Sequence, residues 1–363
     1  MNYSVRLQTL QNESLRSGFD ALLINHLPNV RYLCGFTGSS GVLLLAASGS
    51  VFFTDGRYKE QAREEVKDAK VVIGQRSALA SAAEWLGKRP NRPSSKSLKL
   101  GIEGEHLTVA EQRRLVSTLP KNMIVREAPP LTERARMIKD ADEISLIRDA
   151  VNVGAGLLDY AIESIQLGKT EIEAAARMEF AAREAGADGM SFETIIASGA
   201  RSALPHGQAS NVPIGQGFVV CDFGVILHGY CSDRTRTVYV GSATKDARQI
   251  YSAVLEAQLA AIDAVRPGAS VGSVDQAARK VLRKSSLAKY FTHSTGHGVG
   301  LEIHEAPRVA KGQPEILQPG MVITVEPGVY LPGKWGVRIE DMVVVTEHGC
   351  EVLDPTRKEF IVI

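Results

Sequence analysis

The segments VVCDFG at residues 219–224 and YCSD at residues 230–233 decide the fold of this chain. Each is a short apolar run with an aspartate at or near its end, and residues 225–229 between them can form one tight reversal. This pattern predicts a β-hairpin. If the chain reverses around Leu227 and His228, Asp222 lies directly opposite Asp233, with the two Cβ atoms about 5 Å apart on one face.

A second hairpin with the same arrangement is predicted further along the chain. The segments TVEPG at 324–328 and VRIED at 337–341 flank a turn that contains Gly333. A reversal at Gly333 places Glu326 opposite Glu340. Burying two such acid pairs without partners would cost many kcal/mol or force protonation. Divalent cations remove that cost, because bridging carboxylates can hold two ions about 3.5–4 Å apart.

A glycine-flanked histidine lies between the two hairpins, in the segment HSTGHGVG at 293–300. Its glycines allow close backbone approach and leave the imidazole of His297 accessible. One imidazole with four carboxylates is a hard, oxygen-rich ligand set, which suits Mn²⁺ or Co²⁺, with Zn²⁺ or Fe²⁺ as alternatives. A dinucleotide-binding loop is the other interpretation of GHGVG, but the expected helix pattern does not follow it. The sequence therefore favours a dinuclear metal site.

Outside these motifs, the chain of 363 residues divides into two predicted domains. Residues 1–130 alternate short apolar runs with helical stretches, which predicts a small α/β domain. We expect strands at 21–24, 42–46, 51–54, 71–73 and 100–102, helices at 58–66 and 78–86, and a polar loop at 90–97. The prolines at 129 and 130 cannot continue a helix or a central strand, so the boundary is placed after residue 130.

Residues 131–363 predict an α+β domain, in which helices back a curved antiparallel sheet. The helical patterns cover 142–165, 171–185, 243–265 and 274–284. The strand patterns cover 194–197, 218–222, 230–240, 321–326 and 337–346.

Composition excludes several classes of partner. The 42 Lys and Arg residues balance 41 Asp and Glu, so no charge excess favours nucleic acid or an anionic membrane. The first 17 residues have helical spacing without the apolar core of a signal peptide, and no stretch approaches the roughly 20 apolar residues that span a bilayer. Four scattered cysteines form no CxxC pair, which disfavours disulfides and a thiolate site. We expect a cytoplasmic protein.

The motifs, taken in order, resemble the methionine aminopeptidase/prolidase/creatinase family, whose catalytic domain is the pita-bread fold. The matching segments are SALPHG (202–207), DFG (222–224), GYCSDRTRT (229–237), residues 293–305, EPG (326–328) and RIED (338–341). They cover the catalytic domain end to end. The resemblance implies a pita-bread catalytic domain at 131–363 behind a smaller creatinase-like α/β domain at 1–130, and a homodimer, as is common among relatives.

The resemblance also implies a metal-binding role for each matched ligand. Asp222 would chelate one of two divalent metal ions, with Mn²⁺ the first candidate. Asp233 and Glu340 would bridge both ions, and His297 and Glu326 would complete the other site. Glu326 would also accept a proton from the attacking water, because metal binding brings the pKa of water toward neutrality.

Four further matched residues would act without binding the metal ions themselves. His206, His293 and His304 match histidines that bind substrate and handle protons, and Arg338 matches a residue that holds the acid cluster. Two departures from the family pattern occur. Arg234 stands where an aliphatic residue is common, and the loop that follows His206 is one residue shorter, which leaves the placement of His206 open.

Three N-terminal segments resemble bacterial Xaa-Pro peptidases: NVRY (29–32), GFTGS (35–39) and TDGRY (54–58). The resemblance implies a peptide substrate with proline at its second position, cleaved by an Xaa-Pro aminopeptidase. An Xaa-Pro dipeptidase (prolidase) is the alternative. A creatinase-like hydrolase or an inactive binding module of the same fold is less favoured, because such proteins have lost metal ligands that this chain retains.

Overall fold

The computed structural model describes residues 1–88, 97–166, 168–354 and 356–363, so most of the predicted loop at 90–97 lies outside the described residues. The chain forms two compact units, Met1–Arg136 and Met137–Ile363. The predicted boundary after residue 130 falls just before helix α6 (Leu131–Arg136). This helix stays with the first unit, where Nη1 of Arg136 donates to Oδ1 of Asn29 at 2.7 Å.

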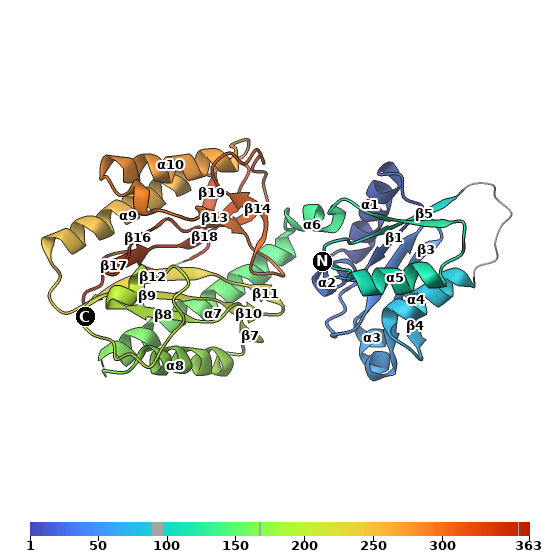
Figure 1. Ribbon diagram of the computed structural model, residues 1–363, viewed down its shortest axis with the longest axis horizontal. Helices are drawn as coiled ribbons and strands as arrows, with labels where there is room; N and C mark the ends of the chain where they lie inside the picture. Colours follow the sequence, from blue (N-terminus) through green and yellow to red (C-terminus); the bar gives the residue numbers. More distant parts are fainter. Residues whose placement is uncertain (89–96, 167, 355) are drawn as a thin grey trace. The chain divides into compact units, whose positions relative to one another are not determined.

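The first unit is built on a six-stranded sheet with the order β4-β3-β2-β1-β5-β6. Its described strands are β1 (Ala21–Ile24), β2 (Val42–Ala46), β3 (Gly49–Asp55), β4 (Lys70–Gly74), β5 (Leu98–Ile102) and β6 (Met123–Glu127). Strands β1, β2 and β3 pair antiparallel, whereas β4, β5 and β6 join in parallel. Figure 1 shows this sheet in blue and teal, with helices packed against it. The predicted α/β class is confirmed.

The helices of the first unit include three α-helices that the sequence patterns did not indicate. They are α1 (Tyr3–Arg16), α2 (Leu27–Cys34), η1 (Gly56–Tyr58), α3 (Lys59–Glu65), α4 (Ala78–Gly87), α5 (Val109–Thr118) and α6. Helices α2, α5 and α6 were missed, as was strand β6. Helix α5 does carry a start signal, since Thr108 and Glu111 form a reciprocal capping box, but its single buried residue, Leu115, gives it little apolar periodicity.

The second unit contains two pairs of long helices and an antiparallel system of short strands. The helices are α7 (Ala141–Gln166), α8 (Glu171–Glu184), η2 (Gly199–Ala203), α9 (Lys245–Asp263), α10 (Val271–Lys284) and η3 (Ala288–Tyr290). The strands are β7 (Gly189–Met190), β8 (Ile195–Ser198), β9 (Gly217–Phe223), β10 (Val225–Leu227), β11 (Tyr230–Cys231), β12 (Arg234–Val240), β13 (Gly296–Gly298), β14 (Glu305–Val309), β15 (Val322–Val325), β16 (Gly328–Leu331), β17 (Trp335–Arg338), β18 (Asp341–Val345) and β19 (Cys350–Val352).

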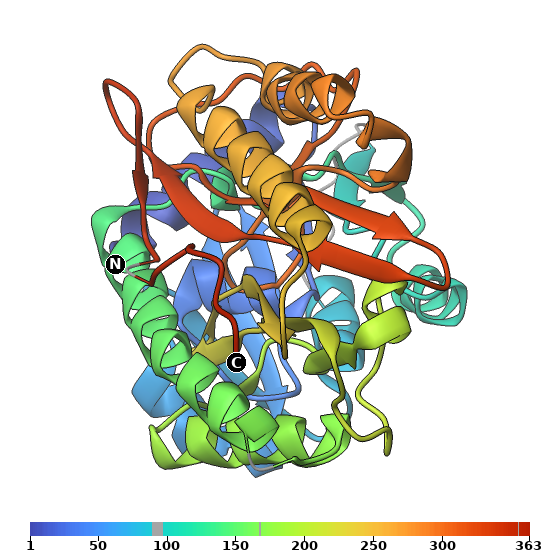
Figure 2. The ribbon, with the colours of Figure 1, turned by 90° about the vertical axis from the view of Figure 1, so that its left-hand side faces the viewer.

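The strands of this unit lie between the two helix pairs. Figures 1 and 2 show α9 and α10 on one side and α7 and α8 on the other. One apolar core joins α9 and α10 to β15, β17 and β18, and another joins α7 and α8 to β8, β9 and β12. Each ladder between these strands is antiparallel. The predicted α+β pita-bread architecture is confirmed. Within the described ranges, no helix is long and apolar enough to cross a bilayer.

Candidate metal centre

The first acid pair is held by the β9–β12 hairpin, in a register that differs from the predicted one. Asp222 pairs with Thr235, not with Asp233. The chain reverses one residue later than predicted, at His228 and Gly229, whose φ angles are 49° and 76°. A two-residue turn of this kind needs positive φ at both positions, which glycine adopts readily. Because the side-chain period of a strand is two, the shift keeps both aspartates on one face as diagonal neighbours.

The second acid pair follows the predicted register. On either side of it, Gly328 pairs with Arg338 and Val325 pairs with Asp341. Glu326 and Glu340 therefore occupy corresponding positions where the ladder is interrupted. The Glu340 amide donates to the carbonyl oxygen of Thr235 at 3.1 Å, and Oγ1 of Thr235 donates to Oε2 of Glu340 at 2.7 Å. These two bonds join the second hairpin to the first.

His297 reaches the same place from strand β13. Its Nε2 lies 3.5 Å from Oδ2 of Asp233 and 3.6 Å from Oε1 of Glu326. Its Nδ1 lies 3.0 Å from the carbonyl oxygen of Gly298, so Nε2 is the nitrogen that faces the carboxylates. One ligand atom each from Asp233, His297 and Glu340 lie within 4.8 Å of one another, a spacing that could hold a metal ion.

Burial makes this acid cluster costly to ionise without a cation. Burial, and then the neighbouring carboxylates, raise the pKa values of Asp233 and Glu340 well above their ordinary range. Burial raises the pKa of Glu326 to about 8. Nη2 of Arg338 lies 2.5 Å from Oδ2 of Asp222, but the buried Oδ1 of Asp222 has no hydrogen-bond partner among the described residues. Divalent cations fit this donor set, because they would pair that oxygen and offset the repulsion.

The imidazole of His297 also fits a metal. Burial lowers its pKa to about 4, so the ring is neutral at pH 7 and one nitrogen carries a free lone pair. The hydrogen bond from Nδ1 to a backbone carbonyl is the usual partner that fixes the ring of a metal-ligating histidine.

Arg338 connects the acid cluster to its surroundings. Its Nε donates to Oγ1 of Thr235 at 3.0 Å and its Nη1 donates to the hydroxyl of Tyr330 at 2.5 Å. Nε2 of His293 lies 3.0 Å from the same hydroxyl, and burial lowers the pKa of His293 to about 4. Tyr330 was not predicted as a site residue, because in the sequence Tyr330 continues an ordinary apolar strand pattern that gives no separate signal.

One cavity of about 540 Å³ brings all the predicted site residues together. Its lining includes Asp222, Asp233, His297, Glu326, Glu340, His206, His293, His304 and Arg338. The rings of His297 and His304 have centroids 4.4 Å apart, and burial lowers the pKa of His304. His206, whose placement the shorter loop left open, lies at the exposed rim. Phe192, Ile195 and Ile303 form an apolar part of the wall.

Arg308 is a second site residue without a sequence signal, an exposed arginine in the lining of this cavity. It pairs with His297 across the β13–β14 ladder. The register of the β13–β14 ladder shifts between His297 and Gly298. The alternation of apolar and polar residues in the sequence therefore could not predict this pairing. Arg308 places a cationic side chain across the ladder from the histidine of the acid cluster.

Comparisons with known proteins agree with this geometry. A model of metallopeptidase family M24 matches residues 145–347, and a model of the creatinase/prolidase N-terminal domain matches residues 6–138. The Xaa-Pro dipeptidase of Pyrococcus furiosus is 47% identical, and the match covers 98% of this chain and 99% of that protein.

Solved structures give the same result. The Xaa-Pro dipeptidase from Bacillus anthracis is 36% identical with a TM-score of 0.93, covering all of both chains. The X-Pro aminopeptidase from Thermotoga maritima is 34% identical with a TM-score of 0.85, covering 97% of this chain and 100% of its own. The chain therefore belongs to metallopeptidase family M24 and carries a creatinase/prolidase N-terminal domain in front of its catalytic domain.

Proposed function

We propose that this metallo-exopeptidase is an Xaa-Pro dipeptidase, which hydrolyses dipeptides with proline at the second position. The Xaa-Pro dipeptidases of Pyrococcus furiosus and Bacillus anthracis, each matched over almost its whole length, support this activity, so we now favour the alternative over the aminopeptidase expected from the sequence. The observation that carries the proposal is Arg308 in the lining of the cavity. Among substrates with proline at the second position, only a dipeptide has a free carboxylate on that proline. A guanidinium group binds a carboxylate through two parallel hydrogen bonds.

The metal ligands in this proposal are Asp222, Asp233, His297, Glu326 and Glu340. Together they would hold two divalent cations, with Mn²⁺ the first candidate for such an oxygen-rich set. When bound, such ions lower the pKa of water and polarise a carbonyl group. Their charge would also offset the mutual repulsion of the buried carboxylates.

Three groups would handle protons around the scissile bond. Glu326 is the proposed proton acceptor, because its carboxylate lies in the cluster and faces the cavity. His304 and His206 line the same cavity, and a neutral imidazole can donate an N–H to the carbonyl oxygen or pass a proton to the leaving nitrogen. Burial lowers the pKa of His304, which keeps this ring neutral at pH 7.

The proline ring would contact the apolar wall that includes Phe192, Ile195 and Ile303. Proline removes a backbone N–H and fixes φ near −65°. A site that recognises proline therefore depends on shape and apolar contact more than on a hydrogen bond to the substrate backbone.

The test is an assay of the Mn²⁺-loaded protein on an Xaa-Pro dipeptide, the same dipeptide as its C-terminal amide, a longer Xaa-Pro peptide and a dipeptide without proline. We expect the free Xaa-Pro dipeptide to give the highest kcat/KM. We also expect Arg308→Ala to raise KM for this dipeptide about 10-fold or more and to leave the KM of its amide nearly unchanged. Equal effects on the acid and the amide would refute the assigned role of Arg308.

An Xaa-Pro aminopeptidase is the second candidate, supported by the Thermotoga maritima structure. The same assay separates the two activities. A kcat/KM that is higher for the longer Xaa-Pro peptide than for the dipeptide would favour the aminopeptidase.

A further inference from the structure

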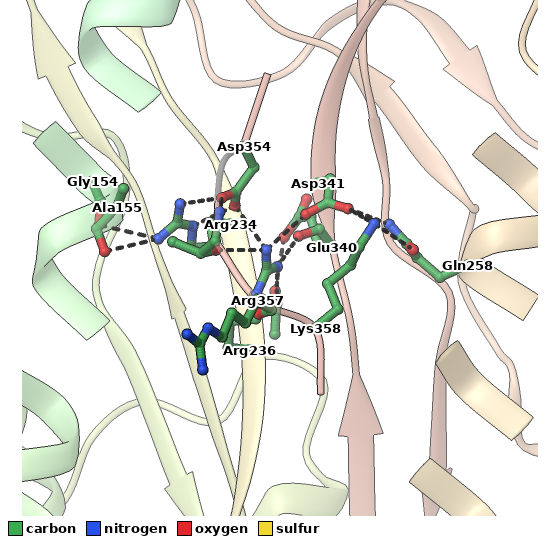
Figure 3. Close-up of polar contacts among 12 residues, drawn as sticks. Gly154, Ala155, Arg234, Arg236, Gln258, Glu340, Asp341, Asp354, Arg357 and Lys358 are labelled. Atoms are coloured by element: carbon green, nitrogen blue, oxygen red, sulfur yellow. Dashed lines mark hydrogen bonds and ion pairs between the residues drawn. The ribbon is translucent and has the colours of Figure 1, made fainter. Parts of the chain in front are cut away.

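A second group of buried charges lies on the reverse face of the strands that hold the acid cluster. Asp233 and Thr235 face the acid cluster, so Arg234 and Arg236 of β12 point the opposite way, because side chains of a strand alternate. Both arginine side chains are at most 4% exposed. We call this group the reverse-face cluster, and its members are Arg234, Arg236, Asp341, Asp354 and Lys358 (Figure 3).

Asp354 joins the two arginines. It accepts from Nε and Nη2 of Arg234 at 2.6 and 2.5 Å, which is a bidentate pair. It also accepts from Nη2 of Arg236 at 3.0 Å. The remaining Nη1 of Arg234 donates to the carbonyl oxygens of Gly154 and Ala155 in α7. A buried carboxylate thus explains how the charged side chain of Arg234 can be buried at this position.

Arg236 carries this contact through to the acid cluster. Its Nη1 donates to the carbonyl oxygens of Glu340 at 2.5 Å and Thr235 at 3.0 Å. These two residues come from different hairpins, and one guanidinium group therefore fixes the backbone of both. On the other face, Oγ1 of Thr235 donates to the carboxylate of Glu340. A displacement of Arg236 would move the carboxylate of Glu340.

The rest of the reverse-face cluster holds Arg236 in place. Asp341, which is fully buried, accepts from Arg236 at 2.8 Å and from Lys358 at 2.6 Å. The hydroxyl of Thr356 accepts from Arg236 and donates to Asp354. The cluster contains three cationic side chains and two carboxylates, so it carries a net positive charge.

We propose that Asp354 is a positioning residue for the metal centre. Through Arg234 and Arg236 it fixes Asp233 and Glu340, two of the proposed ligands, where they would hold divalent cations. The inference rests on the proposed ligand set, and it concerns residues on the face away from the cavity. Groups that orient metal ligands in this way typically change metal affinity 10–100-fold when they are removed.

The experiment compares Asp354→Asn with the native chain after chelator treatment. Isothermal titration with Mn²⁺ should show about 10–100-fold weaker binding in the variant. The visible absorption spectrum of the Co²⁺-loaded variant should differ from that of the native protein, because the ligand geometry changes. Thermal unfolding of the metal-free variant should remain cooperative. A native protein that binds no metal would refute the proposed ligand set itself.

The matched control is Glu351→Gln. Glu351 forms a bidentate pair with Arg148 in α7, as Asp354 does with Arg234, but its side chain is 50% exposed. We expect native Mn²⁺ affinity and a native Co²⁺ spectrum. If Asp354→Asn does not fold, Thr356→Val provides the test instead. This variant removes the hydroxyl that contacts Arg236 and Asp354 and changes no charge. Native Mn²⁺ affinity and a native Co²⁺ spectrum in Asp354→Asn would overturn the inference. The same result in Thr356→Val would overturn it if Asp354→Asn is unfolded. Mn²⁺ binding that is weakened equally in Glu351→Gln would also overturn it.

Discussion

At the scale of single residues, the acid cluster is defined by carboxylates that are buried beside one another. Asp233, Glu326 and Glu340 all have raised pKa values, with burial as the largest cause. His297 lies between two of them. Each of these side chains is costly to bury alone, and a pair of divalent cations is the partner that their chemistry favours.

Asp233→Ala should remove both activity and metal. The carboxylate lies next to His297 and Glu340 within the spacing of a metal site, and the family resemblance implies that it would bridge both ions. We expect kcat to fall by more than about 100-fold, the upper end seen for residues that only orient ligands. Elemental analysis should find less than one metal per chain. Two metals per chain with full turnover would disprove the bridging role.

His304→Ala should separate catalysis from metal binding. The His304 ring lies in the cavity and packs against His297, but its proposed role is to handle a proton in the transition state. We expect kcat to fall about 10²–10⁴-fold, with native metal content by elemental analysis. A native kcat would contradict that role, and lost metal would instead assign His304 to the ligand set.

The metal-free protein should lose stability as pH rises above neutrality. The pKa of Glu326 is raised from 4.5 to about 8 in the folded state, so the folded chain binds this proton more tightly and the gain is lost as pH rises toward 8. His293 and His297 have lowered pKa values and act in the opposite direction, but only below their ordinary value of 6.5.

Between pH 6.5 and 8 the carboxyl groups therefore determine the sign. We expect the Tm of chelator-treated protein to fall over this interval, and added Mn²⁺ to reverse the fall. Thermal unfolding followed by circular dichroism measures both. A Tm that rises from pH 6.5 to 8 in the presence of chelator would contradict the raised carboxyl pKa values.

At the scale of elements, the site depends on close approach between short strands. A Cβ on Gly296 of β13 would collide with the carbonyl oxygen of Thr324 in β15, so glycine is needed beside His297. Gly296→Ala should push β13 away, destabilise the fold by about 1–3 kcal/mol and weaken metal binding. Urea unfolding and Mn²⁺ titration measure these effects.

Gly156 in α7 is the matched control for Gly296. It is exposed, and a Cβ there would meet open space. Gly156→Ala should stabilise the protein by about 0.5–1 kcal/mol, because alanine is favoured over glycine within a helix. Equal metal affinity in both alanine variants would show that the β13–β15 approach does not position His297.

Sequence periodicity predicted most of these elements but not every register. The turn at Gly333 was read correctly, and with it the correspondence of Glu326 and Glu340. The turn at His228 and Gly229 was misplaced by one residue, because a left-handed histidine has no distinct signal in sequence. The predicted acid pair was still correct, because the partner of Asp222 changes by two residues, from Asp233 to Thr235. A change of two residues leaves Asp222 and Asp233 on the same face.

At the scale of the whole molecule, the motif order predicted the family while long-range contacts remained hidden. Nothing in the local sequence connects Asp354 with Arg234, which are 120 residues apart along the chain. Nor does a local pattern reveal that Arg308 pairs with His297, because the register of this ladder shifts between His297 and Gly298. Contacts that form only through tertiary packing leave no periodic pattern in the sequence from which they could be predicted.

We also predict a homodimer, as the family resemblance implies. Light scattering coupled to size-exclusion chromatography should give about twice the 39.2 kDa mass of one chain. A mass equal to one chain at micromolar concentration would contradict this prediction.

In the proposed metal centre, four carboxylates and one imidazole converge to hold two divalent cations. Anomalous X-ray scattering from crystals of the Mn²⁺-loaded protein would locate these ions. We expect two anomalous peaks per chain about 3.5–4 Å apart, surrounded by Asp222, Asp233, His297, Glu326 and Glu340. A map with no peak among these side chains, or with Mn²⁺ bound only elsewhere, would contradict it.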